Sequence, residues 1–228
     1  MEQRRDSATA YIILADGFET IEALTPLDVL RRCGVEVTTI SLNKTRAVRS
    51  SHGVTVEADA TMEDFMHNCN CCASGTGTGT NSSIAGSSTS ASDTNTTAST
   101  STNVSGTMRQ ALILPGGYPG YKNLCESAEV GALITQFHKE GKLLCAICGA
   151  PTALKANQIC RGAAITCHTS VKEELSDYYS ILSSAVVKYM NIITGMGAGR
   201  SLEFAFAIAE ALTSKEKVEE IKAKMEII

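Results

Sequence analysis

Short apolar runs alternate along this chain with segments whose apolar residues recur every three or four positions. An uninterrupted apolar run is typical of a buried strand, and a recurrence of three to four residues is typical of an amphipathic helix. The runs predict strands at residues 10–15, 35–42, 53–59, 110–117 with a glycine turn, 142–147, 163–166 and 187–194. The recurrences predict helices at residues 19–33, 60–65, 130–141, 170–179 and 201–212, with a short helix starting at Ala150.

The alternation of strands with helices predicts the fold class. Strands that are apolar throughout need cover on both faces, and helices between them supply it over a mostly parallel sheet. We therefore expect an α/β fold, a doubly wound α/β/α sandwich formed by a single domain over residues 1–228. Residues 73–107 are nearly all Ser, Thr, Gly, Ala and Asn, so we predict a disordered insertion between two elements of that domain.

Composition narrows the function classes. The 228 residues carry a formal charge of -4 and offer no dedicated nucleic-acid surface. No apolar run reaches the roughly 18 residues that a membrane span needs, so we expect no membrane contact and a cytoplasmic protein. Nine cysteines are an odd number in a chain that nothing marks as secreted, which favours free thiols over disulfides.

Cys148 is the first candidate for chemistry. Catalytic groups gather at the carboxyl ends of parallel strands, and Cys148 stands between a predicted strand and a predicted helix. Amides at the start of that helix favour a thiolate, and the small Gly149 and Ala150 allow a tight turn, although a buried core thiol is the competing interpretation. Cys145 lies three positions earlier, on the opposite face by strand alternation, so we interpret it as a core thiol rather than a redox partner.

Two other strand ends carry candidate groups. Asp16, Glu19 and Glu22 follow the first predicted strand. A buried carboxyl there could share a proton with a thiolate, whereas solvated acids at a helix start would give the same pattern. Gly116 and Gly117 follow another apolar strand, where their N–H groups could form an oxyanion hole or simply belong to a turn.

Three further motifs have competing interpretations. His168, at the end of a short predicted strand, is placed to act as an acid or base, although a lone histidine is more often structural. The sequence HNCNCC at residues 67–72 has adjacent cysteines, an awkward arrangement for tetrahedral zinc, so we predict no metal site. The sequence GMGAGR at residues 195–200 departs from dinucleotide-binding spacing and is better interpreted as a turn.

Four sequence blocks, in this order, resemble the DJ-1/ThiJ/PfpI family, and its DJ-1-like branch in particular. They are LADGFETIEALTPLDVLRRCGVEVT, LILPGGYPGYKNL, AICGAPTAL and RSLEFAFAIAEAL. The resemblance spans about residues 9–66 and 108–228 and leaves out the predicted insertion. It implies a flavodoxin-like sandwich of the class I glutamine amidotransferase type, usually dimeric, which agrees with the fold class expected from the hydrophobic pattern.

The resemblance also implies residue roles. Cys148 matches the reactive, oxidisable cysteine of the family, Glu22 the protonated glutamate that hydrogen-bonds it, and His168 the nearby histidine. Gly116 and Gly117 match the glycine pair whose amides face the site. Members are described as cofactor-independent glyoxalases, as deglycases, and as oxidative-stress sensors or chaperones.

We accordingly expect a homodimeric glyoxalase or deglycase that needs no cofactor or metal and acts on 2-oxoaldehydes such as methylglyoxal or on glycated proteins. In this hypothesis Cys148 attacks the aldehyde, while Glu22 and His168 move protons. The oxyanion is held by amides of Gly116, Gly117 and Gly149. The alternatives are a redox sensor or chaperone in which Cys148 is oxidised without turnover, and an amidotransferase-type hydrolase.

Three positions depart from the family pattern. Gly149 stands where protease-like members carry a histidine directly after the nucleophile, which argues against a peptidase. His52 and Met196 stand where animal members carry arginines that line the site. Arg200 is the candidate substitute for those positive charges.

Overall fold

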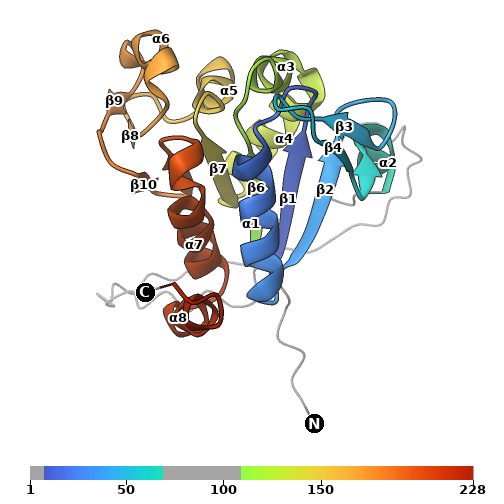
Figure 1. Cartoon of the computed structure of the whole chain (residues 1–228). Helices are drawn as coiled ribbons and strands as arrows, with labels where there is room; N and C mark the ends of the chain where they lie inside the picture. The colour runs from blue at the N-terminus through green and yellow to red at the C-terminus, as the bar shows by residue number, and fades with distance from the viewer. Residues whose placement is uncertain (1–7, 69–108, 228) are drawn as a thin grey trace, which may run out of the picture.

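The computed structural model describes residues 8–68 and 109–227, in which a seven-stranded sheet forms the centre of the molecule (Figure 1). The strand order is β10-β11-β7-β6-β1-β2-β5, and every pair is parallel except β10 with β11. These strands are β1 (Thr9–Leu14), β2 (Glu36–Ser41), β5 (Ala60–Thr61), β6 (Gln110–Leu114), β7 (Leu143–Ile147), β10 (Val186–Tyr189) and β11 (Ile192–Gly195). The predicted insertion at residues 73–107 lies outside the described residues.

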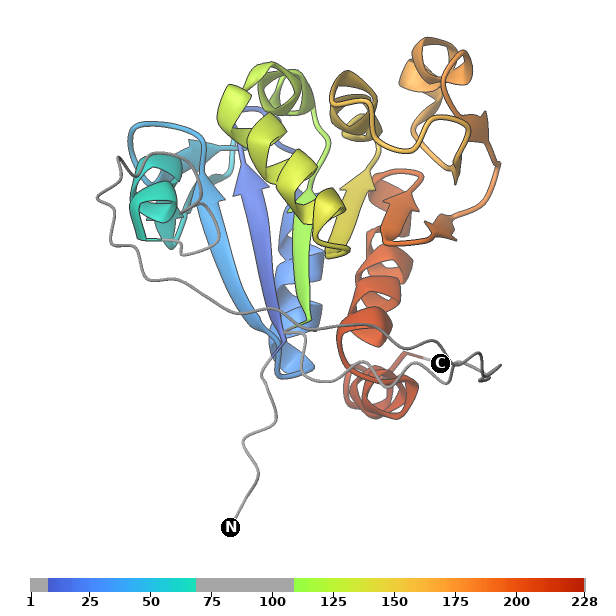
Figure 2. The ribbon, with the colours of Figure 1, turned by 180° about the vertical axis from the view of Figure 1, so that it is seen from behind.

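Helices cover the sheet on both faces, as the hydrophobic pattern predicts (Figures 1 and 2). One face carries α1 (Thr20–Arg32) and α7 (Ser201–Leu212), which lie side by side, and α8 (Lys215–Lys224) follows at the end of the chain. The other face carries α2 (Met62–Asn68), α3 (Gly120–Glu126), α4 (Ala128–Lys139) and α5 (Pro151–Ala156). The described residues therefore form an α/β/α sandwich.

Apolar side chains on the two faces of the sheet belong to two separate hydrophobic clusters. Along β1, Ile12 and Leu14 join the cluster that contains α1 and α7, whereas Ile13 joins the cluster that contains α4. This division follows from strand geometry, because successive side chains point to opposite faces. The clusters hold both helical layers against the strands and so fix where the strand ends lie.

The structure differs from the predicted elements mainly at the sheet edges. The single strand predicted at 187–194 is a hairpin of β10 and β11, because Met190 takes a left-handed φ of 50° without a glycine to mark the turn. The strands predicted at 53–59 and 163–166 join two small separate sheets, β3 (Ala47–Arg49) with β4 (Thr55–Glu57) and β8 (Ala164–Ile165) with β9 (Ser180–Ile181). The predicted helix at 170–179 is a 3₁₀ turn, η2 (Thr169–Val171), followed by the short α6 (Lys172–Ser176). A second turn, η3 (Ala198–Arg200), precedes α7, and the sequence pattern did not predict α3 or α8.

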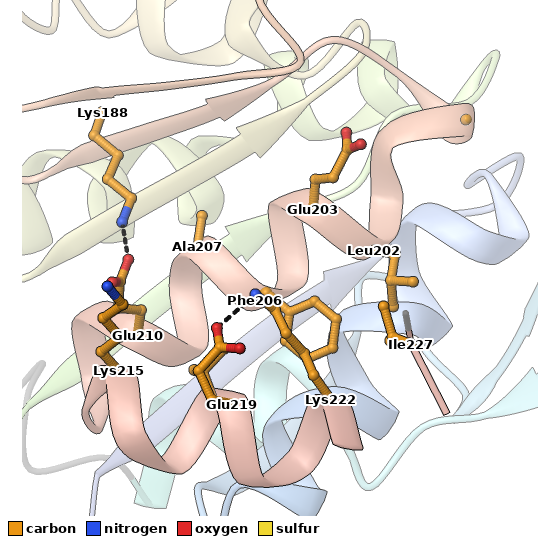
Figure 3. A pocket seen from close by; sticks show the side chains of 12 residues that line it. Lys188, Leu202, Glu203, Phe206, Ala207, Glu210, Lys215, Glu219, Lys222 and Ile227 are labelled. Carbon is orange, nitrogen blue, oxygen red and sulfur yellow. Dashed lines mark hydrogen bonds and ion pairs between the residues drawn. The ribbon is translucent and has the colours of Figure 1, made fainter. Parts of the chain in front are cut away.

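A hollow of about 630 Å³ lies between α7 and α8 (Figure 3). Leu202, Phe206 and Val218 line it, and its rim includes two ion pairs, Lys188–Glu210 at 2.6 Å and Lys222–Glu219 at 2.8 Å. The residues around it include none of the catalytic candidates from the sequence. Within residues 8–68 and 109–227, no helix combines the length and apolar character needed to cross a membrane.

Candidate active site

Cys148 lies directly after β7, in a turn that several backbone contacts hold in place. Its φ of 65° is left-handed, a conformation that costs energy for any residue with a Cβ and persists only where the surroundings impose it. The Cys148 N–H donates to the Gly195 carbonyl at 2.9 Å, and the Cys148 carbonyl accepts from the His168 N–H at 2.9 Å. These two hydrogen bonds hold the Cys148 backbone in place and so fix the position of its Cβ atom.

The Cys148 side chain is half-buried and packs partly against the same hydrophobic cluster as Cys145. The predicted placement of the two sulfurs on opposite faces is therefore wrong. Alternation applies only inside the strand, which ends at Ile147, and the left-handed turn redirects the next side chain. Cys145 is fully buried in β7, in agreement with its interpretation as a core thiol.

Glu22 is the acid that the fold brings to Cys148. Its side chain is completely buried, and its Oε2 accepts a 2.9 Å hydrogen bond from the Gly116 N–H. The carboxyl also hydrogen-bonds the Cys148 thiol, while Oε1 finds no well-aligned donor among the described residues. The other two acids have structural roles: Glu19 caps α1 by accepting from the Glu22 N–H at 2.8 Å, and Asp16 accepts from the Arg49 N–H at 2.9 Å.

Burial raises the pKa of Glu22 from 4.5 to about 7, against the lowering effect of its hydrogen bonds to Cys148 and Gly116. Burial, followed by the charge and hydrogen bond of Glu22, raises the pKa of the Cys148 thiol to about 12. The expectation that helix amides lower the pKa of this thiol is therefore wrong. Burial and Glu22 raise the pKa by more than the amides of Gly117 and Gly149 lower it.

The two groups titrate as a pair, so their protonation states must be considered together. Once the pair has lost one proton, the remaining proton can lie on sulfur or on the carboxyl. When it lies on Glu22, the neighbouring negative charge disappears and the amides of Gly117 and Gly149 still face the sulfur. This arrangement can present a thiolate next to a neutral acid that is able to return a proton.

None of the three candidate glycines has room for a side chain, and at Gly116 the Glu22–Cys148 pair itself fills the space. A methyl group on Gly116 would lie 2.6 Å from Glu22 Oε2 and 2.7 Å from Cys148 Cβ. Gly117 has a φ of 89°, and a methyl group there would clash with the Glu19 backbone nitrogen. The Gly116 N–H is already bound to Glu22, which leaves Gly117 and Gly149 as the amides that face the sulfur.

His168 approaches Cys148 through its backbone only. Its exposed imidazole caps η2, where Nδ1 accepts from the Ser170 N–H at 3.2 Å and lies 2.8 Å from Ser170 Oγ. The ring also lies against Gly197. Among the described residues, the contacts of this imidazole do not include the thiol or Glu22, so the expected proton-transfer role has no geometric support.

The positions expected to replace arginines do not bring a guanidinium to the sulfur. His52 lies 3.7 Å from Glu19 Oε1 at the surface, and Met196 is held through a backbone bond to Ala185. Arg200 pairs with Glu203 at 3.1 Å, and both side chains are exposed. The polar groups that act on the Cys148 thiol are the Glu22 carboxyl and the amides of Gly117 and Gly149.

Tyr121 is the site residue that the sequence pattern did not reveal. A methyl group on Gly149 would lie 2.7 Å from Tyr121 Cδ1 and 2.8 Å from its Cγ, so the ring lies directly against that peptide. It lies within the block LILPGGYPGYKNL, but neither the hydrophobic pattern nor the resemblance gave it a role. A glycine directly after the candidate nucleophile is the one sequence signal that something else fills the space.

The described part of the chain contains neither a disulfide nor a cluster of metal-binding side chains. The six described cysteines are free, and no cluster of three or more His, Cys, Asp or Glu side chains suited to a metal occurs within residues 8–68 and 109–227. Most of the HNCNCC motif, residues 69–72, lies outside that part of the chain.

The fold and the site together define the class of protein. It is a class I glutamine amidotransferase-like α/β protein with a strained cysteine at a strand end beside a buried glutamate. The DJ-1/PfpI family profile matches residues 8–211. The chain is 32% identical to protein dj-1beta of Drosophila melanogaster over 216 residues, 94% of this chain and 95% of the relative. The chain belongs to the DJ-1/PfpI family.

Two further relationships are informative. The crystal structure of Drosophila melanogaster DJ-1beta superposes with a TM-score of 0.77 at 31% identity, covering 97% of this chain and 99% of that chain. The glutathione-independent glyoxalase DJR-1.2 of Caenorhabditis elegans is 39% identical over 107 residues, 46% of this chain and 56% of that protein. The family therefore includes glutathione-independent glyoxalases.

Proposed function

We propose that this protein is a cysteine-dependent, glutathione-independent glyoxalase that acts on 2-oxoaldehydes such as methylglyoxal, or a deglycase that acts on their early adducts with proteins. The observation that carries the proposal is the buried Glu22 carboxyl held against the strained Cys148 by the Gly116 N–H. The relative in Caenorhabditis elegans that is named as a glyoxalase supports the reaction class.

The first step is attack of the Cys148 sulfur on the aldehyde carbon. The C–S bond forms, the carbonyl oxygen gains a negative charge, and the amides of Gly117 and Gly149 stabilise it before it takes a proton. The product is a hemithioacetal. Glu22 supplies or removes the proton, because its pKa of about 7 lets it exist in both states near neutral pH.

The second step moves a proton between the two carbons of the substrate. Glu22 removes the hydrogen from the carbon bonded to sulfur and returns a proton to the neighbouring carbon, which converts the hemithioacetal into a thioester of lactate. Water then hydrolyses the thioester, releasing lactate and restoring the thiol. The sum is methylglyoxal plus water to lactate, with no oxidant or reductant.

D-lactate formation from methylglyoxal without glutathione tests the proposal. Cys148→Ala should lower turnover at least roughly 1000-fold, and Glu22→Gln roughly 100-fold or more, because each removes a group that touches the reacting atoms. Cys125→Ser is the matched control, since it replaces a half-buried thiol that bonds the Thr152 carbonyl away from this pair. Full activity of Cys148→Ala would end the proposal.

The alternative is a redox sensor or chaperone in which Cys148 is oxidised once and not turned over. The same carboxyl and amides can stabilise oxidised sulfur, so the site supports either class. Intact-mass spectrometry after mild peroxide, run beside the lactate assay, separates them. Stoichiometric oxidation without lactate formation favours the sensor.

Assembly and location belong to the same proposal. We infer a homodimer, as is usual in the DJ-1/PfpI family, and light scattering of the purified chain measures its oligomeric state. We also propose a cytoplasmic location, which fractionation of cells expressing the tagged protein would test.

A further inference from the structure

Tyr121 connects the two loops that present their amides to the Cys148 sulfur. Its N–H donates to the Gly117 carbonyl at 2.9 Å, and its ring lies against Gly149, where even a methyl group would lie 2.7 Å away. The amides of Gly117 and Gly149 are the two that face the sulfur. Tyr121 therefore touches both loops, with its backbone at Gly117 and its ring at Gly149.

Tyr121 is only half-buried, so part of the residue remains accessible to solvent. One side packs against the hydrophobic cluster that contains α4, and Lys122 Nζ lies 5.4 Å from the ring centroid. Tyr118 extends the aromatic surface: its ring centroid is 6.3 Å from that of Tyr121, the planes are tilted by 57°, and its side chain is 72% exposed. Two tyrosines thus form a wall at the edge of the site.

We propose that this wall, Tyr121 with Tyr118, is a subsite for a planar aromatic group on the substrate, so that the site favours aryl-substituted 2-oxoaldehydes over methylglyoxal. The inference rests on the proposed function. In a 2-oxoaldehyde the sulfur attacks the terminal carbon, and the substituent is on the next carbon, close to the Gly149 peptide that the Tyr121 ring covers. Aromatic rings gain by stacking beyond the apolar area that they bury, whereas a methyl group covers little of such a surface.

Alkylation of Cys148 by two bromoketones tests the subsite without turnover. Phenacyl bromide and bromoacetone differ only in a phenyl or methyl group beside the carbonyl. In each case the sulfur forms a bond to the bromine-bearing carbon, bromide leaves, and the thiol proton is released to Glu22 or solvent. The rate at Cys148 is measured by peptide mass mapping and divided by the rate with free cysteine.

In wild type the corrected preference for phenacyl bromide should be about 10-fold. Tyr121→Ala should reduce it to within about 2-fold of free cysteine, and Tyr121→Phe should retain it, because the ring and not the hydroxyl provides the surface. Tyr118→Ala should reduce it about 3-fold. Tyr189→Ala, a partly exposed tyrosine on the edge strand β10 that pairs at the end of the sheet opposite Cys148, should leave it unchanged.

A wild-type preference that persists in Tyr121→Ala would overturn the subsite. If circular dichroism shows that Tyr121→Ala does not fold, Tyr118→Ala carries the test, since its exposed ring contributes little to the core, and an unchanged preference again overturns the proposal. D-lactate formation by wild type is measured in parallel. Lactate formation with no aromatic preference removes the subsite alone, whereas an aromatic preference without lactate removes only the glyoxalase function.

Discussion

Cys145 and Cys148 are three residues apart, yet they lie in different chemical surroundings. Cys145 is inside β7 and fully buried, and burial alone raises the pKa of its thiol well above its usual value. Cys148 follows the strand in a left-handed turn, where a buried acid and two backbone amides act on its sulfur. Both sulfurs contact the same hydrophobic cluster. Polar neighbours from distant parts of the chain, and not packing, distinguish the candidate nucleophile from the core thiol.

The largest expected effect concerns Glu22, the acid that acts on the Cys148 thiol and not on the Cys145 thiol. Its folded pKa of about 7 lies above its unfolded value of 4.5, so the folded protein holds the proton more tightly. The stability that this gives is complete below pH 4.5 and is lost as the pH rises through 7. A difference of about 2.5 pKa units corresponds to about 3 kcal/mol.

Urea denaturation at pH 4 and pH 8 measures this difference. Between these values, wild type should lose about 3 kcal/mol more unfolding free energy than Glu22→Gln, in which no proton is exchanged at this position. Comparing the two proteins removes the contributions of other titrating groups. Equal losses in both would show that Glu22 has an ordinary pKa in the folded protein.

Alkylation of the two thiols should respond differently to denaturant. Cys145 is reached only when the chain opens, so its rate with iodoacetamide should rise roughly 10-fold in 1 M urea, given typical denaturant slopes. Cys148 is half-buried and reacts in the folded state, so its rate should change less than about 2-fold. Peptide mass mapping follows the alkylation of both cysteines in one sample. If both rates rose equally with urea, Cys148 would also be inaccessible to iodoacetamide in the folded state.

Gly116→Ala tests how tightly the thiol and carboxyl are held together. The added methyl group has no room between Glu22 and Cys148, so unfolding free energy should fall by about 1 to 3 kcal/mol, with loss of lactate formation. Gly199→Ala is the matched control, because nothing lies within 4 Å of its added methyl group. Thermal or urea denaturation that ranks the two variants equally would contradict this packing.

Cys145→Ala should give the smallest effect. Removing the sulfur leaves a small void under the sheet, and the expected loss of unfolding free energy is about 1 kcal/mol. Lactate formation should remain within about 2-fold of wild type, because burial is the only influence on this thiol and neither Glu22 nor the glycine amides act on it. A large loss of activity with unchanged stability would give Cys145 a role in the chemistry.

Much of the fold could be predicted because hydrophobic periodicity reports burial. The predicted helix at 201–212 has the bounds of α7, and the strands β1, β2, β6 and β7 lie where apolar runs occur. The hairpin of β10 and β11 was missed because the left-handed residue at its turn is Met190, a type with no turn preference. Short elements at the edges depend on what packs over them, and local pattern carries little of that information.

The candidate site, like the fold, could be predicted only in part from the local sequence. The position of Cys148 at a strand end follows from local sequence, since an apolar run ends there and small residues follow. The choice among Asp16, Glu19 and Glu22 does not, because all three are acids near the start of one helix. Only the packing of α1 on the sheet buries Glu22 and leaves the other two at its rim.

The sequence by itself determined the layered α/β architecture, the strand-end cysteine and the glycines around it, because these depend on periodicity and on backbone steric limits. The tertiary structure alone decided which groups act on the sulfur. It placed Glu22 and Gly117 beside Cys148, used the His168 imidazole to cap a turn, and set Tyr121 against Gly149. Residues far apart in the chain meet only when the helices pack, and the pKa of each buried group is set by that meeting.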